Sequence, residues 1–150
     1  MAQHDSLEKL ASTGLLKHEP PGREEIAGLL RTATVRLEDA RKTTNAPESR
    51  FDLAYNAAHA FALAALRIHG FRTDKRYAVF QALPHTLEVD TPTWRLLDRC
   101  HRERNAAEYR GIASVDEKLL SGLIEAALDL LTRVRALAES RGFLDAESKG

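Results

Sequence analysis

The segment from Glu48 to His69 limits the fold of this chain more than any other part of the sequence, because it is apolar on two sides of a helix. One side carries Phe51, Ala54, Tyr55, Ala58, Phe61, Ala62, Ala65 and Ile68, and the second carries Leu53, Ala57, Ala60 and Ala64. A helix that is apolar around most of its circumference and rich in Ala is closely surrounded by other helices. The segment therefore predicts the central helix of an all-α bundle.

Helical periodicity also dominates the rest of the chain, and no window shows the sustained alternation of apolar and polar residues that is typical of strands. We expect further helices over residues 5–13, 23–42, 75–83, 94–109 and 115–141. Helix-breaking residues stand between them, including Pro20-Pro21-Gly22, Pro47, Pro84 and Gly111. The pattern predicts an up-and-down bundle of four or five main helices.

The length and composition indicate one globular domain. The chain has 150 residues, of which 43% are hydrophobic and 29% are charged, and a chain of this size buries a core without disulfides or metals. We expect a single domain over residues 1–150, with its core over about 23–141. The last residues, 145–150, are expected to be frayed.

Charge and cysteine content exclude several classes of protein. Lys and Arg together number 22, as do Asp and Glu, so no overall field attracts nucleic acid, and any RNA-binding site must be a local patch. Cys100 is the single cysteine, which suits a reducing compartment. The first ten residues lack the apolar core of a secretory signal, and no apolar stretch reaches the about 18 residues of a membrane span. A cytoplasmic, bacterial-type protein with no membrane association is expected.

Arginines recur along the segment from Trp94 to Gly111, with acids interleaved. Most of them fit a solvated helix face on which pairs such as Arg95–Asp98 and Arg99–Glu103 form at helical spacing.

Arg104 differs from these, because on a helical wheel it falls near Leu97 and Cys100, within the apolar stripe. An arginine on the packing side is costly unless it is paired or lies at a cleft or interface. Asn105 adds an amide beside it, and Glu108 follows one turn later. Arg104 is therefore either a structural residue tied to a buried carboxylate or a functional residue at a cleft.

Two segments together give the chain a resemblance to the HEPN family. The first runs from Phe51 to Ala60 and on to Arg67-Ile68-His69-Gly70, and the second is Arg104-Asn105-Ala106-Ala107-Glu108-Tyr109. The resemblance implies a helical bundle of HEPN type that forms a homodimer. It also implies metal-independent RNA cleavage at the dimer cleft in active members, or binding of nucleotides or proteins in others. Members occur as toxins of toxin–antitoxin pairs, often beside a nucleotidyltransferase.

In active members, an Arg, a following polar residue and a His act on the RNA phosphate. The resemblance therefore implies Arg104, Asn105 and Tyr109 as candidate catalytic residues. We also take His101, Arg102, Glu108 and His59 as candidate binding residues.

Tyr109 stands where the family has its histidine, and a phenol with a pKa of about 10 is a poor base at pH 7. A second alignment, of Arg95 with His101, restores a histidine but places Leu96 where a polar residue is usual. His59, on an otherwise apolar helix, fits a hydrogen-bonded core histidine or a base.

We expect no metal and no cofactor, because the histidines are scattered without ligand spacing and no phosphate-binding glycine loop is present. The sequence leaves two functions open. One is a dimeric HEPN-like binding module with a degenerate nuclease motif, possible ligands being RNA, a nucleotide or an antitoxin or nucleotidyltransferase partner. The other is a HEPN endoribonuclease toxin.

Overall fold

The computed structural model describes residues 2–110 and 115–145, with side chains for residues 5–106 and 115–145. In chain order the elements are α1 (Ala2–Ser12), β1 (Lys17–His18), α2 (Arg23–Ala40), α3 (Pro47–Ile68), β2 (Phe71–Arg72), α4 (Arg76–Gln81), α5 (Leu83–Thr86), α6 (Thr91–Arg110) and α7 (Glu117–Ser140). The predicted all-α fold class is confirmed.

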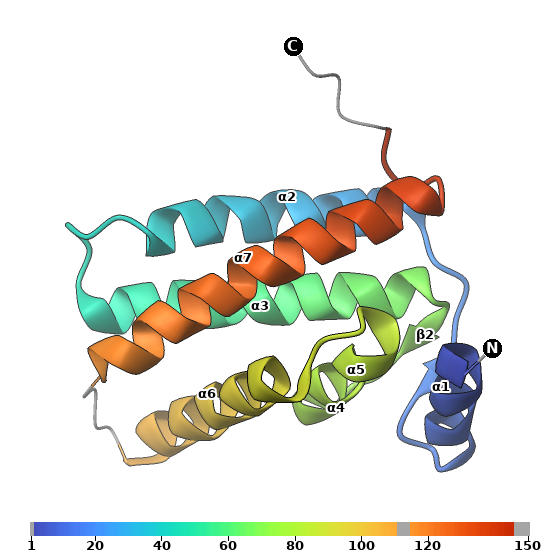
Figure 1. The fold of residues 1–150 in the computed structure, drawn as a ribbon, viewed down its shortest axis with the longest axis horizontal. Helices are drawn as coiled ribbons and strands as arrows, with labels where there is room; N and C mark the ends of the chain where they lie inside the picture. The colour runs from blue at the N-terminus through green and yellow to red at the C-terminus, as the bar shows by residue number, and fades with distance from the viewer. Residues whose placement is uncertain (1, 111–114, 146–150) are drawn as a thin grey trace.

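Helix α3 lies at the centre of the bundle (Figure 1). Helix α2 lies along one side of it and α7 crosses it, and its most extensive contacts are with these two. Helices α4, α5 and α6 lie on the side away from α2, where α6 packs mainly against α7. The predicted central helix is thus confirmed, and it carries residues that reach both layers of the bundle.

The core forms because α3 presents small and aromatic side chains around most of its surface. Along this helix, the residues with no exposed surface are Ala54, Tyr55, Ala57, Ala58, Phe61, Ala62, Ala64, Ala65 and Leu66. The many Ala side chains let α2 and α7 approach closely, while leucines of α7 fill the remaining space. Tyr55 is the one hydroxyl-bearing side chain in this set, which makes its surroundings informative.

A second, smaller cluster attaches the N-terminal segment to the bundle. Leu7 and Leu16 pack with Leu66, Phe71, Ala78 and Ala82. Strand β1 pairs with β2 in a two-stranded antiparallel sheet, with Lys17 opposite Arg72 and His18 opposite Phe71. The sequence did not predict this sheet, because two-residue strands are too short to show alternation.

Most helix boundaries differ from the predicted ones by one to three residues, and two of the differences have a clear cause. Pro84 does not close a helix as predicted: it lies in the first turn of α5, where a missing N–H costs nothing, and the break comes at Ala82. Helix α6 begins at Thr91, three residues early, because the Asp90 carboxylate accepts a hydrogen bond from the Thr93 N–H at 3.0 Å.

Gly70 ends α3 as predicted, with a φ of 88° that favours glycine. The predicted end of α6 at Gly111 and the tail beyond residue 145 lie outside the described residues. Within the described ranges, none of the helices has the length and apolarity needed to cross a membrane.

Candidate functional site

Arg104 lies on the packing side of α6, as its position on the helical wheel predicted. Its side chain is only 18% exposed, and its guanidinium lies over the ring of Tyr55, 4.8 Å from the ring centroid. The Arg104 Nε atom is 3.8 Å from a carboxylate oxygen of Asp52, whose side chain is 67% exposed. The Asp52 carboxylate beside Arg104 is therefore a solvent-facing one.

His101 lies one turn from Asn105 on α6 and is held through both ring nitrogens. Its Nδ1 is 2.8 Å from the Tyr55 hydroxyl oxygen, and Asn105 Nδ2 donates to its Nε2 at 3.2 Å. An amide nitrogen is always a donor, so Nε2 accepts and the proton of the neutral ring is on Nδ1. In this arrangement His101 donates to the Tyr55 hydroxyl.

Phe80 of α4 is the aromatic centre around which these residues are arranged. Its ring centroid lies 5.8 Å from that of Tyr55, 5.7 Å from that of His59 and 6.1 Å from that of His101. Edge contacts of this kind fix ring orientation. The site thus joins α3, α4 and α6.

His59 lies inside this cluster, and its Nε2 atom is buried with no hydrogen-bond partner. Burial is the main reason that the pKa of His59 falls from about 6.5 to about 4, and the positive charges of Arg76 and Arg104 lower it further, as does His101. His59 is therefore neutral at pH 7.

The pKa of His101 is also lowered, first by burial and then by the charges of Arg76 and Arg104, while Asp98 opposes the shift. Arg76, the first residue of α4, is thus close enough to act on both histidines. Two guanidinium groups from two helices create a local positive field in a chain with no net charge.

The arrangement offers donors to an anion. Arg104 and Arg76 supply guanidinium groups, and Asn105 supplies an exposed amide, while Tyr55 provides an aromatic face under Arg104. Guanidinium groups bind phosphate through two parallel hydrogen bonds. Among the described residues, no group of three His, Cys, Asp or Glu side chains could hold a metal ion.

The structure brings together four of the residues singled out in the sequence: Arg104, Asn105, His101 and His59. Arg102 is not among them, because its side chain is 71% exposed and pairs with Asp98 at 3.3 Å. The side chains of Glu108 and Tyr109 lie outside the described residues.

The arginine pairs on α6 also differ from the expected ones. Asp98 pairs with Arg102 instead of Arg95, and Arg99 lies 3.9 Å from Asp116 at the start of α7. Arg95 is exposed and six residues from His101, about 120° away around the helix. The alternative pairing of Arg95 with His101 therefore does not form one site in this chain.

Sequence reasoning missed Tyr55, Phe80, Asp52 and Arg76 as members of the site. Of these, only Tyr55 could have been identified from the sequence. Its hydroxyl stands within an apolar stripe, and a buried hydroxyl needs a hydrogen-bond partner. Phe80 and Arg76 come from a separate short helix, whose docking against α6 no local pattern predicts.

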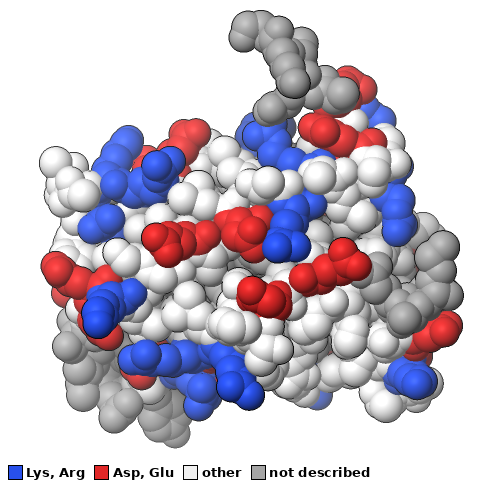
Figure 2. All heavy atoms as spheres, viewed as in Figure 1, with Lys and Arg blue, Asp and Glu red and all other residues white. Residues whose placement is uncertain are grey.

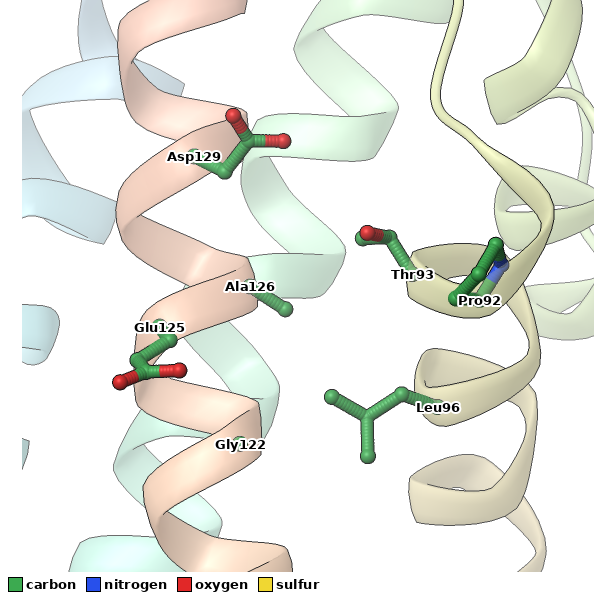
Figure 3. A pocket seen from close by; sticks show the side chains of 7 residues that line it. All are labelled: Pro92, Thr93, Leu96, Gly122, Glu125, Ala126 and Asp129. Carbon is green, nitrogen blue, oxygen red and sulfur yellow. The ribbon is translucent and has the colours of Figure 1, made fainter.

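A pocket of about 280 Å³ lies elsewhere, between α6 and α7 (Figure 3). It is lined by Pro92, Thr93, Leu96, Gly122, Glu125, Ala126 and Asp129. Figure 2 shows acidic atoms in a band over α7 and basic atoms below them, over α6. The carboxylates of Glu125 and Asp129 repel anions, so this pocket does not suit a phosphate.

No protein-family profile, curated protein or solved structure matches this chain significantly.

Proposed function

We propose that this chain is a HEPN-like module that works as a homodimer and binds the phosphate group of a nucleotide or of RNA at the Arg104 cluster. The cluster comprises Arg104, Arg76, His101 and Asn105, resting on Tyr55 and Phe80. The observation that carries the proposal is the position of Arg104, mostly buried against the Tyr55 ring beside an exposed carboxylate.

A mostly buried guanidinium is stabilised by negative charge close to it. Asp52 supplies one carboxylate 3.8 Å from the Arg104 Nε atom, and this carboxylate is well solvated. A phosphate that reaches the guanidinium can also accept a hydrogen bond from the exposed Asn105 amide. A ligand phosphate would therefore contact two side chains of α6 at once.

Binding is favoured over cleavage because of the way His101 is held. A general base needs a free lone pair, and the Nε2 lone pair of His101 accepts a hydrogen bond from Asn105. Its other nitrogen is engaged by the buried hydroxyl of Tyr55. In this geometry the Nε2 lone pair of His101 faces the Asn105 amide and does not take the proton of a ribose hydroxyl.

Metal-independent RNA cleavage is the second candidate, favoured by one observation: the lowered pKa of His101 keeps its imidazole neutral at pH 7. If the exposed Asn105 amide turns away, Nε2 can take the proton of a ribose 2′-hydroxyl. The 2′-oxygen then bonds to phosphorus, the bond from phosphorus to the 5′-oxygen breaks, and that oxygen is protonated. Arg104 would stabilise the charge on the phosphorane oxygens.

The test is an equilibrium titration of a labelled, unstructured oligoribonucleotide, followed by fluorescence anisotropy without divalent metal. We expect Arg104→Gln to weaken binding by about tenfold or more, because it removes a charge-assisted contact. Arg102→Gln is the matched control, since Arg102 lies on the same helix but is exposed. Equal affinity of wild type and Arg104→Gln would reject the cluster as the site.

The same samples, run on a denaturing gel, separate binding from cleavage. Intact RNA supports the binding module, whereas products made by wild type and lost in both Arg104→Gln and His101→Gln support the nuclease. A mass measurement in solution tests the proposed homodimer directly. Co-purification with an antitoxin or nucleotidyltransferase would extend the proposal to a toxin–antitoxin pair.

A further inference from the structure

Tyr77 is an aromatic side chain that the fold leaves in solvent. It is 41% exposed. Among the described residues, Val35 is the one other large hydrophobic side chain that is exposed. Val35 lies on α2, on the far side of α3 from α4 (Figure 1). Tyr77 instead directly follows Arg76, a member of the Arg104 cluster.

The helical geometry of α4 places Tyr77 at the edge of that cluster. At about 100° per residue, Phe80 falls between Arg76 and Tyr77 on the helix surface, one turn further along. Phe80 is buried against Tyr55, His59 and His101, so this sector of α4 faces the cluster. Residues three apart have Cβ atoms about 5–6 Å from each other, which sets the exposed Tyr77 beside the buried Phe80.

The other two positions of this helix turn point away from the cluster. Ala78 and Val79 are buried in the packing of α4 against the rest of the bundle. The exposed side chains of α4 are Arg76, Tyr77 and Gln81, so a guanidinium and an aromatic ring are neighbours on its solvent-facing side. That combination is typical of surfaces that hold a phosphate and stack a base next to it.

Resting on the proposed function, we infer that Tyr77 stacks the base of the ligand, so that the site takes a phosphate ester that carries an unpaired nucleobase. The phosphate lies at Arg104 and Arg76, and the base lies on the Tyr77 ring. A base paired within a duplex has both faces covered by its neighbours, and such a ligand is excluded. A mononucleotide and a single-stranded RNA share the required chemistry.

The experiment compares three variants with wild type: Tyr77→Ser, Tyr77→Phe and Val35→Ser. Each is titrated with a single-stranded oligoadenylate, adenosine 5′-monophosphate, ribose 5-phosphate and an RNA duplex. Tyr77→Ser should lose roughly tenfold in affinity for the first two, because stacking on an aromatic ring contributes about that much per base. It should bind ribose 5-phosphate as wild type does.

Tyr77→Phe keeps an aromatic face and should retain wild-type affinity, and Val35→Ser, which makes the same change of polarity elsewhere, should have no effect. The relative affinities of the monophosphate and the oligoadenylate then show whether the site prefers a mononucleotide or single-stranded RNA. If Tyr77→Ser binds the oligoadenylate as tightly as wild type while Arg104→Gln does not bind it, the inference is wrong and the proposed function stands. If neither wild type nor any variant binds these ligands, both fail together.

Discussion

At the scale of a single residue, His59 occupies a position in the site that destabilises its protonated form. Its imidazole sits with a buried, unpartnered Nε2 atom, near the positive charges of Arg76 and Arg104. Such a position is unfavourable for a proton, and the fold tolerates it because the ring packs edge-on against Phe80. A site selected for stability alone would place an apolar side chain here.

We therefore predict that His59 makes the protein acid-sensitive. Its pKa is about 4 in the folded chain and about 6.5 when unfolded. Between these values the unfolded state binds more protons, so stability falls as the pH falls through this window. From pH 7 to pH 4, His59 should remove about 3 kcal/mol from the free energy of unfolding.

Urea denaturation at several pH values checks this, with His59→Gln as the comparison. Other groups titrate in both proteins, so the difference between the two curves isolates His59. The variant should lose less stability than wild type on acidification. Parallel curves would show that His59 is not held neutral by its surroundings.

At the scale of elements, Arg67 joins the C-terminal end of α3 to the N-terminal segment. Its side chain is 5% exposed and donates to the backbone carbonyls of Glu19, Pro20 and Phe71 at 3.0 to 3.1 Å. It also forms ion pairs with the carboxylates of Glu19 and Glu25, both at 3.1 Å. One guanidinium therefore supplies hydrogen-bond donors to carbonyl oxygens of the loop before α2 and of the strand after α3.

We predict that Arg67→Met lowers the free energy of unfolding by about 2–4 kcal/mol, because it leaves buried carbonyls without donors. Glu19 and Glu25 are nearly half exposed and stay solvated, which limits the loss. Lys42→Met removes an exposed pair with Asp39 and should change stability by less than about 0.5 kcal/mol. Equal effects of the two substitutions in chemical denaturation would contradict this role for Arg67.

The same comparison shows which elements the sequence can predict. Helix α3 was predictable because its two apolar sides repeat over many turns, and Arg104 stood out because it breaks the pattern of its own helix. The two-stranded sheet of β1 and β2 depends on the docking of α1 and on Arg67, which are long-range contacts. Tyr55 and Phe80 entered the site for the same reason, since their neighbours come from other helices.

The whole molecule has no net charge, so attraction for an anionic ligand must arise from the local arrangement of its charges. The acidic band over α7 and the basic atoms over α6 divide the visible face (Figure 2). The Arg104 cluster contains His101, and His59 lies beside it; both histidines are neutral at pH 7. Protonation of either one would increase the positive charge next to the ligand.

We predict that the affinity for a phosphodiester oligoribonucleotide rises as the pH falls from 7.5 to 5.5. The lowered pKa of His101 leaves it neutral at the upper end of this range, and a bound phosphate favours its protonated form. A phosphodiester keeps the same charge between pH 7.5 and 5.5, so a change in affinity over this range arises from titration of the protein. In His101→Gln, the slope of affinity against pH should flatten, and an unchanged slope would exclude His101 as the titrating group.

The position of the bound phosphate is the central claim, and a nuclear magnetic resonance titration tests it most directly. Wild-type protein, labelled with nitrogen-15, is titrated with a single-stranded oligoribonucleotide while the arginine Nε–H and asparagine side-chain signals are followed. The account predicts that the signals of Arg104 and Asn105 shift together, while that of Arg133, which is paired with Asp129 on α7, stays in place. Shifts confined to the exposed arginines of α6, with Arg104 unchanged, would contradict it.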